Sequence, residues 1–194
     1  MRIIDLHCYP NTQKWIDCQG PYVDALEKYW GRAWQAKTEE EVVAEFKEFD
    51  IEAMLVALDL TTTIETPPCD NDYVAGMRDR HDSIIQAWAA VEPALGQAAV
   101  DEARHAINDL KMIGFHFHPI MQHIRVDDKS FYPLWEELTQ LKAPVMIDVG
   151  MTGMGAGMPG GLGAKTRNAH PASIDALAAD FPELTIIMSH PGYP

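Results

Sequence analysis

Cysteine, long apolar runs and positive charge are all scarce in this sequence. Its three cysteines, Cys8, Cys18 and Cys69, are an odd number without C-x-x-C spacing, which excludes a disulfide scaffold and is typical of a reducing compartment. No stretch approaches the roughly 18 consecutive apolar residues of a membrane-spanning helix. The first residues show no basic segment followed by an apolar core, so we expect no secretory signal and a cytoplasmic location.

The charge balance narrows the class of partner. Lysine and arginine number 15 against 29 aspartates and glutamates, for a formal net charge of -14. So acidic a chain, without a basic cluster, would repel nucleic acids and anionic membranes. The expected partner is therefore a small-molecule substrate. With 194 residues and 47% hydrophobic content, we expect one domain spanning residues 1–194 around one core.

Short apolar runs alternate with segments of helical periodicity. One such segment, "TEEEVVAEFKEF", begins with a capping box from Thr38 to Glu41. Several runs are apolar on both faces, as buried parallel strands are. The order predicts an α/β fold with a parallel sheet and right-handed crossovers, either open or curled into a barrel. The predicted strands are Ile3 to Tyr9, Met54 to Leu60, Ile84 to Val91, Ile113 to His118, Pro144 to Gly150 and Thr185 to His190.

Side chains capable of chemistry gather at the ends of these six runs. In a barrel, working residues lie at the carboxyl ends of the strands and in the loops that follow them. An open sheet would instead gather them at one switch point. The pattern therefore favours a barrel with a shared site at its mouth. The residues in question are His7, Tyr9, Asp59, Glu92, His116, His118, Asp148 and His190.

The glycine-rich stretch "GMTGMGAGMPGGLGAKTRNAHP" does not satisfy the nucleotide-binding motifs. Gly155, Gly157 and Gly160 match G-x-G-x-x-G, but about ten residues separate them from the next expected helix, where the motif requires a helix to open directly. Ala164 replaces the glycine that a phosphate-binding loop carries before its lysine. We expect a long loop that either covers a substrate or is simply exposed.

Five segments of the chain resemble the amidohydrolase-related family of the metal-dependent hydrolase superfamily, in the branch that contains aminocarboxymuconate semialdehyde decarboxylase. They are "IIDLHCYP", "GFHFHP", "FYPLWEELTQLKAPVMIDVG", "GMPGGLG" and "DFPELTIIMSHPGYP". The resemblance implies a TIM-barrel-like (β/α)8 fold with a divalent metal, zinc or manganese, at the strand ends. A closed barrel has eight βα units and typically about 250 residues. Six units in this chain therefore predict an incomplete barrel, apparently truncated after the sixth strand.

The ligand set that the resemblance implies is altered in this sequence. His7 matches the first histidine of the family's His-x-His pair, but Tyr9 replaces the second. His116 stands where the resemblance implies a lysine, and Asp148 where it implies a histidine, whereas His190 matches. We expect His7, Asp148 and His190 to hold one ion, with His116 or Tyr9 as a further ligand, because imidazole and carboxylate both suit zinc or manganese. The alternative is that His7 and His190 are hydrogen-bonded core residues with Asp148 as their partner.

Other side chains are candidates for the expected mouth. The residues expected to bind substrate are Tyr9, His118, Arg125 and Arg167. An arginine there would pair with a substrate carboxylate, although solvent exposure of both arginines is the competing interpretation. Trp15, Trp30 and Trp34 follow the first strand and are expected either to form an aromatic wall or lid or to pack in the core.

Two classes of function remain open at this stage. The first is a metal-dependent hydrolase or carboxy-lyase acting on a small, aromatic or carboxylated substrate, with His190 or Asp148 as general acid or base when not a ligand. The second is a catalytically silent relative that serves as a binding or interaction module. Two absent βα units would leave apolar edges on the first and sixth strands. We therefore expect a fragment of a longer protein, or else a chain that fills the gap by helix rearrangement or by dimerisation as a homo-oligomer; the fragment is the favoured interpretation.

Overall fold

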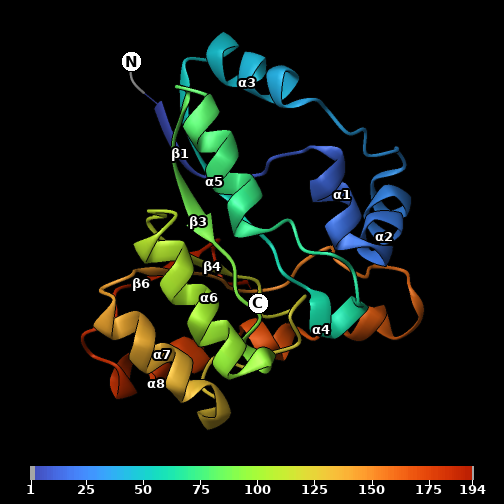
Figure 1. The fold of residues 1–194 in the computed structure, drawn as a ribbon. Helices are drawn as coiled ribbons and strands as arrows, with labels where there is room; N and C mark the ends of the chain where they lie inside the picture. Colours follow the sequence, from blue (N-terminus) through green and yellow to red (C-terminus); the bar gives the residue numbers. More distant parts are fainter. Residues whose placement is uncertain (1–2, 194) are drawn as a thin grey trace.

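Six parallel strands form the centre of the molecule, and helices occupy the connections between them (Figure 1). The computed structural model describes residues 3–193. The strands pair in the order of the sequence, and every neighbouring pair is parallel. They are β1 (Ile3–Cys8), β2 (Ile51–Val56), β3 (Ile84–Ala89), β4 (Gly114–Phe117), β5 (Val145–Asp148) and β6 (Ile186–Ser189). The predicted α/β fold with six βα units is confirmed.

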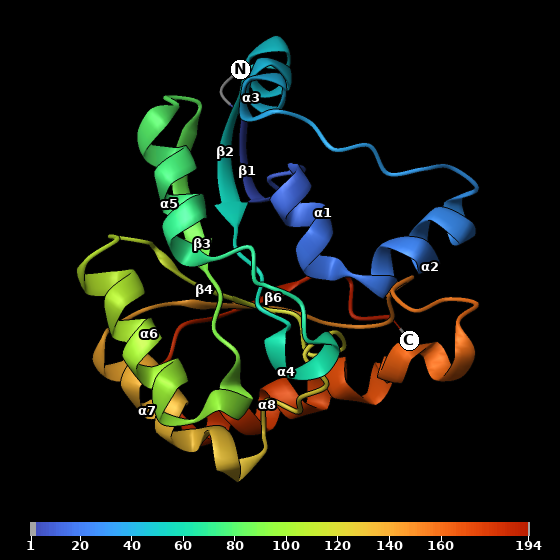
Figure 2. The same cartoon turned by 45° about the vertical axis from the view of Figure 1, so that its right-hand side comes forward.

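The helices form an outer layer and a separate group beyond the strand ends. Figures 1 and 2 show α5 to α8 along the outside of the sheet, whereas α1 and α2 stand beyond the carboxyl end of β1. The α-helices are α1 (Gln13–Gln19), α2 (Pro21–Trp30), α3 (Glu39–Glu48), α4 (Thr61–Ile64), α5 (Asn71–Arg80), α6 (Gln97–Asn108), α7 (Tyr132–Gln140) and α8 (Pro171–Asp180). Short 3-10 turns are η1 (Pro93–Leu95), η2 (Lys129–Phe131), η3 (Pro159–Gly163) and η4 (Thr166–Ala169). Within residues 3–193, no helix combines the length and apolar character needed to cross a membrane.

The start of α3 illustrates how local sequence sets an element boundary. The Thr38 hydroxyl accepts a hydrogen bond from the Glu41 backbone N–H at 3.2 Å, and the Glu41 carboxylate accepts one from the Thr38 N–H at 2.7 Å. These two bonds satisfy donors that a helix start leaves unpaired. The predicted capping box is therefore confirmed.

The second strand lies earlier in the chain than the sequence predicts. The apolar run from Met54 to Leu60 indicates a strand there, whereas β2 spans Ile51–Val56. Pairing with β1 decides the register, since Ile51 is the partner of Ile3. After β2 the chain leaves the sheet, and Leu58 instead forms an antiparallel bridge with Cys69. Asp59 consequently lies in a loop rather than at the end of the strand.

The sheet is curled, so its two edge strands approach each other at the carboxyl end. The imidazole rings of His7 on β1 and His190 after β6 have centroids only 5.6 Å apart. On the concave side, the Trp88 indole N–H from β3 donates to the Leu6 carbonyl of β1 at 2.9 Å. The molecule is a partial barrel, and its strand ends surround one space.

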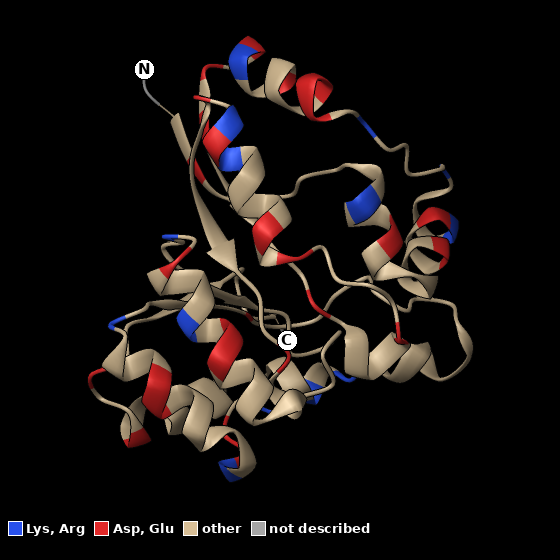
Figure 3. Ribbon diagram, in the orientation of Figure 1, with Lys and Arg blue, Asp and Glu red and all other residues tan. Residues whose placement is uncertain are grey.

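Burial differs between the centre of the sheet and its edges. Phe115 and Phe117 on β4 are fully buried, and Phe117 packs edge-on against Trp135 of α7 with ring centroids 4.9 Å apart. In contrast, Leu6 on β1 and Met188 on β6 are 48% and 56% exposed. Charged residues lie mainly on helices and loops, and the strands are mostly uncharged (Figure 3). The edges of the partial barrel are thus apolar and uncovered.

Candidate metal centre and substrate cavity

Three strands bring potential metal ligands together at the carboxyl edge of the sheet. His7 on β1, His116 on β4 and Asp148 on β5 each offer one ligand atom, and these atoms all lie within 4.8 Å of one another. Strand periodicity explains the position of His116, because its neighbours Phe115 and Phe117 take the alternate face and pack in the core. The side chain of His116 is left to point into the interior, where it meets Asp148.

Asp148 is surrounded by histidines. Its Oδ2 atom lies 3.3 Å from Nε2 of His116 and 3.7 Å from Nε2 of His118, and its Oδ1 atom lies 3.3 Å from Nε2 of His190. The ring of His7 completes the group, with its centroid 4.7 Å from that of His116. The structure therefore brings together all four residues expected as metal ligands, together with His118.

Several buried nitrogen and oxygen atoms in this group make no hydrogen bond. Among the residues described, they include Nε2 of His7, both ring nitrogens of His116 and Oδ1 of Asp148. Buried polar groups nearly always have a partner, so this concentration of unsatisfied atoms indicates a space built for another species. Imidazole nitrogens and a carboxylate are ligands for zinc and manganese. The residues present thus fit a divalent metal, whereas a hydrogen-bonded core with His116 Nε2 paired to Asp148 would still leave His7 Nε2 and His116 Nδ1 without a partner.

The protonation states also suit metal ligation. Burial lowers the pKa of His7 to about 4, and the neighbouring His116 adds to this effect. For Asp148, burial acts to raise the pKa, but His116 and the other histidines outweigh it and hold the value well below the usual range. At neutral pH, His7 is therefore uncharged and Asp148 is ionised, which are the forms that bind metals.

His118 and His190 differ in how they are held. Nδ1 of His118 accepts the Met121 backbone N–H at 3.2 Å, which leaves Nε2 to face Asp148. Burial lowers the pKa of His118. The side chain of His190 is half-exposed, and the neighbouring Asp148 carboxylate raises its pKa. His190 is thus the histidine of the group best able to carry a proton.

A cavity of about 590 Å³ opens above this group. Tyr9, His118, Asp148 and His190 line its inner part. Burial raises the pKa of Tyr9 to about 12, so its phenol stays neutral. Tyr9 also stacks on the buried Trp15, with ring centroids 4.9 Å apart. Trp15 consequently packs beneath the cavity rather than lining it.

The outer wall of the cavity is aromatic and apolar. Trp30 of α2 and Trp34 both line it, with ring centroids 5.7 Å apart, in agreement with the wall considered from the sequence. Sequence reasoning missed Leu26 and Tyr29, which also line it. The signal was present, because residues 26, 29 and 30 have the i, i+3, i+4 spacing of one helical face.

The long loop after β5 closes another side of the cavity. Its residues 149 to 154 contribute lining atoms. Farther along, the Leu162 carbonyl accepts a hydrogen bond from the Tyr22 hydroxyl of α2 at 3.1 Å, and Tyr22 also pairs with Nε2 of His123 at 3.0 Å. Gly163 has a φ of +83°, and a Cβ there would lie 2.4 Å from the His123 ring. This close approach, at a φ that favours glycine, places the loop against His123, which in turn pairs with Tyr22 of α2.

The two predicted arginines lie elsewhere. Arg125 and Arg167 line a separate surface hollow together with Asp127 and His170. The guanidinium of Arg125 forms an ion pair with Asp127 at 2.5 Å. The structure does not bring either arginine to the cavity above Asp148, so a role in binding substrate there finds no support in their position.

Comparison with solved structures identifies relatives of the fold. An uncharacterised TIM-barrel protein from Bordetella bronchiseptica is 19% identical, with a TM-score of 0.69 over 100% of this chain and 68% of the other. 5-Carboxyvanillate decarboxylase LigW from Sphingomonas paucimobilis is 15% identical, with a TM-score of 0.68 over 96% of this chain and 67% of the other. A dihydroxybenzoic acid decarboxylase from Polaromonas sp. JS666, with bound manganese and the inhibitor 2-nitroresorcinol, is 18% identical, with a TM-score of 0.61 over 97% of this chain and 65% of the other.

These structures show that the chain has the fold of a TIM-barrel protein and how much of such a protein it covers. The chain spans about two thirds of the length of each of these three proteins. A search of curated protein sequences gave no match. A sequence model of the amidohydrolase family, however, matches residues 4–194, almost the whole chain. The chain therefore belongs to the amidohydrolase family.

Proposed function

We propose that this chain forms the metal-binding half-barrel of a metal-dependent hydrolase or carboxy-lyase that acts on a small aromatic carboxylate. The observation that carries the proposal is the set of buried, unsatisfied donor atoms of His7, His116 and Asp148 at the base of an aromatic-walled cavity. A silent binding module would have no need to keep these atoms without hydrogen bonds, because unsatisfied buried polar groups destabilise a fold.

The metal ligands in this proposal are His7, His116 and Asp148, with His190 as a further ligand or as the proton carrier. A bound divalent metal would supply Lewis-acid polarisation of a carboxylate or carbonyl oxygen. Trp30 and Trp34 would hold a flat ring by stacking and would exclude water. His190 would keep a proton on Nε2, beside Oδ1 of Asp148, and act as the general acid or base.

The structural neighbours support the substrate class. Two of them are decarboxylases whose names specify 5-carboxyvanillate and dihydroxybenzoic acid, and one of these holds manganese. Both named substrates are aromatic acids. The aromatic wall of this cavity can stack on the ring of such a molecule, and a divalent metal can bind its carboxylate. A hydroxylated benzoate is accordingly the substrate type that we propose for this site.

Metal content provides the first test. The 194-residue chain, incubated with Mn²⁺ or Zn²⁺ and desalted, should retain stoichiometric metal by elemental analysis. The double variant Asp148→Ala/His190→Ala should lose it while keeping its helical circular dichroism, because residues at a barrel mouth contribute little to the packed layers below. The matched control Arg125→Ala/Arg167→Ala removes two charged side chains outside the cavity and should retain the metal. Equal metal content in the parent and the first variant would contradict the proposed centre.

Ligand binding tests the substrate class separately. In the metal-loaded chain, 2,6-dihydroxybenzoate should quench the fluorescence of Trp30 and Trp34 saturably, whereas cyclohexanecarboxylate, which lacks an aromatic ring, should bind more weakly. Failure of every hydroxybenzoate to bind the loaded chain would overturn the aromatic substrate while leaving the metal centre in place. Release of carbon dioxide or of a hydrolysis product would then distinguish the two reaction types.

A further inference from the structure

A second cavity lies on the other side of the strand ends. Its volume is about 310 Å³, and it lies between the loops that follow β2 and β3 and the amino-terminal parts of α5 and α6. It shares no lining residue with the cavity above Asp148. All the elements around it belong to the middle of the sheet, so its walls do not depend on the exposed strands β1 and β6.

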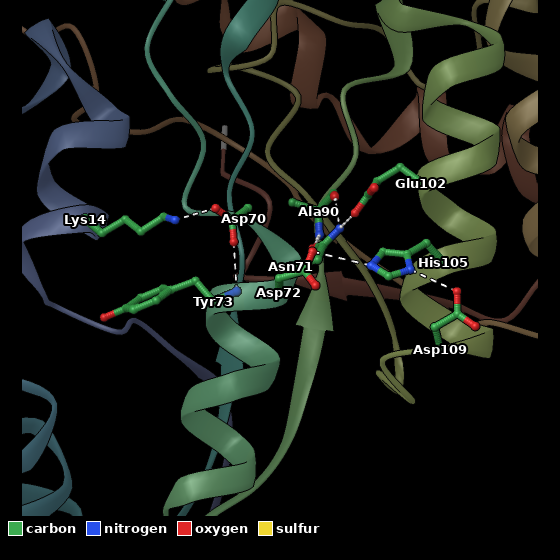
Figure 4. Close-up of polar contacts among 9 residues, drawn as sticks. All are labelled: Lys14, Asp70, Asn71, Asp72, Tyr73, Ala90, Glu102, His105 and Asp109. Atoms are coloured by element: carbon green, nitrogen blue, oxygen red, sulfur yellow. Dashed lines mark hydrogen bonds and ion pairs between the residues drawn. The ribbon is translucent and has the colours of Figure 1, made fainter.

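All the charged side chains that line this second cavity are acidic. Five carboxylates line it, and no lysine, arginine or histidine does: Asp59, Asp70, Asp72, Glu92 and Glu102. Two of the five are partly neutralised from outside, because Lys14 pairs with Asp70 and the His105 ring lies 3.4 Å from Asp72 (Figure 4). The remaining carboxylates have no cationic partner among the ion pairs within residues 3–193.

Asn71 fixes the geometry of one wall. Its side-chain N–H donates to the Ala90 carbonyl at 2.9 Å and to Glu102 at 2.6 Å, while its oxygen accepts the Ala90 N–H at 2.8 Å (Figure 4). These bonds join α5, α6 and the end of β3. The cavity is therefore a built feature of the fold, with Glu102 held in a defined position.

Glu92 supplies the observation that points to a ligand. The residue is only 1% exposed, and its Oε2 atom is buried without a hydrogen bond, whereas Oε1 accepts the Ala94 backbone N–H. A buried carboxylate with an unsatisfied oxygen is costly unless a donor or a cation meets it. Burial, with the repulsion of Asp59, raises the pKa of Glu92 to about 7, although the Ala94 N–H and the nearby Thr62 side chain act to lower it. A cation beside Glu92 would remove both penalties.

The shape of the site argues against a metal ion. Within residues 3–193, only His7, His116 and Asp148 place three acidic, histidine or cysteine ligand atoms within 4.8 Å of one another. The carboxylates of the second cavity are more widely spread, and the volume is that of a small organic molecule. Apolar side chains, including Leu58, Val91 and Leu95, line the rest of it.

We propose that this second cavity binds a short aliphatic amine, with its ammonium group between Glu92 and Asp59 and its methylene chain against Leu58, Val91 and Leu95. A primary ammonium has three N–H donors, enough for the free Oε2 atom and a neighbouring carboxylate. A diamine would place its second ammonium group toward Glu102 or toward Asp70 and Asp72. The site is independent of the proposed metal centre, since the two share no residue.

Calorimetric titration of the 194-residue chain, in an amine-free buffer at pH 8, tests this proposal. Butylamine and 1,4-diaminobutane should bind saturably, the diamine more tightly, and butanol should not bind. Glu92→Gln should weaken amine binding by roughly tenfold or more, the size expected for a lost charged hydrogen bond. Asp175→Asn removes one exposed acidic charge of α8, outside the cavity, and should change the affinity by less than about twofold, as a long-range, screened effect would.

Three results would overturn the proposal. The first is the absence of saturable amine binding by the parent. The second is an equal affinity in the parent and Glu92→Gln, with Asp59→Asn also unchanged, which would place the amine elsewhere. The third is tight binding of Mg²⁺ or Ca²⁺ that displaces the amine, because that would make the acidic cavity a metal site. In the supporting case, amide NMR shifts on titration should centre on residues 90–92 and 70–72.

Discussion

Asp148 and Glu92 are both buried carboxylates, yet their neighbours give them opposite electrostatic character. Asp148 lies among His116, His118 and His190, which keep its pKa well below the usual range although burial opposes this. Glu92 has another carboxylate, Asp59, as its charged neighbour, so burial and repulsion act together to raise its pKa. At neutral pH Asp148 therefore stays ionised, whereas Glu92 is about half protonated.

The titration of Glu92 predicts a pH dependence of stability. Its pKa rises from an ordinary 4.5 to about 7 in the folded chain, so the folded state binds more protons than the unfolded state between those values. The contribution of Glu92 to the free energy of unfolding should therefore fall as the pH rises through this window, by an amount on the order of 3 kcal/mol. The lowered pKa of His7 acts in the opposite direction, so urea unfolding at pH 5 and pH 8, in amine-free buffer, should show the Glu92 loss as the difference between the parent and Glu92→Gln.

Glu92→Gln cannot ionise and should lose less stability between pH 5 and pH 8 than the parent does. Asp175→Asn serves as the control, because Asp175 is exposed on α8 outside the cavity and should leave the Glu92 contribution intact. An identical pH slope in Glu92→Gln and the parent would show that this carboxylate is not the group responsible.

At the scale of single residues, the alternation of side chains along strands made the cluster around Asp148 predictable from the sequence. The ion-pair partners of residues in loops were not predictable. Alternation of buried and polar residues along the strands predicted that His7, His116 and Asp148 share one space. No such rule governs an arginine in a loop. Arg125 pairs with a carboxylate two positions away, at Asp127, and lines a separate hollow. Sequence separation in a loop carries too little geometric information to decide such an outcome.

At the scale of elements, boundaries set by local contacts were predictable and those set by distant contacts were not. The capping box at Thr38 and Glu41 requires only neighbouring residues, and the helix begins there as predicted. β2 begins at Ile51 because Ile51 pairs with Ile3, almost fifty positions earlier, although the apolar run itself continues to Leu60. Hydrophobicity identified that a strand exists, while the partner strand decided where it starts.

The hydrogen bonds that attach the long loop after β5 to α2 predict the effect of a substitution at Tyr22. The Tyr22 hydroxyl donates to the Leu162 carbonyl and meets Nε2 of His123, and the residue is fully buried. Tyr22→Phe removes both bonds while filling nearly the same volume. The expected cost is about 1 kcal/mol in the free energy of unfolding, the size of a lost hydrogen bond, because His123 is exposed and Leu162 is partly exposed, so both can bond to water instead.

The loss should also be local. Hydrogen exchange at residues 151–165 should accelerate in Tyr22→Phe, together with cleavage of this loop by added protease. Tyr29→Phe is a suitable control, because the exposed Tyr29 of the same helix makes no hydrogen bond to the loop among the residues described. Unchanged exchange in the loop of Tyr22→Phe would mean that other contacts hold it.

At the scale of the whole molecule, the curl of the sheet creates the cavity and leaves two edges open. The strand ends of β1 and β6 approach closely enough for His7 and His190 to face each other. Their outer edges, however, have no neighbouring strand among the residues described. The number of strands followed from the sequence, since each has its own apolar run. How far the sheet curls could not be predicted, because curl depends on packing among all the helices and strands at once.

These edges predict self-association of the 194-residue chain. Ile4 and Leu6 on β1 are 47% and 48% exposed, and Met188 on β6 is 56% exposed. Unpaired parallel edges with apolar side chains are ready templates for pairing with another chain, and we propose that a second copy of this chain covers them. Light scattering coupled to size-exclusion chromatography should show a mass above that of one chain, increasing with protein concentration.

Variants at β1 should distinguish association through this edge from non-specific association through exposed apolar side chains. Ile4→Lys/Leu6→Lys places two charges on the edge and should shift the population toward the monomer, because like charges on facing edges repel and ammonium groups resist burial. Leu95→Lys is the matched control, since Leu95 is 46% exposed but follows β3 in the middle of the sheet, and it should leave the association unchanged. A parent that remains monomeric at every concentration, or a control variant that dissociates as readily as the edge variant, would show that β1 and β6 do not drive assembly.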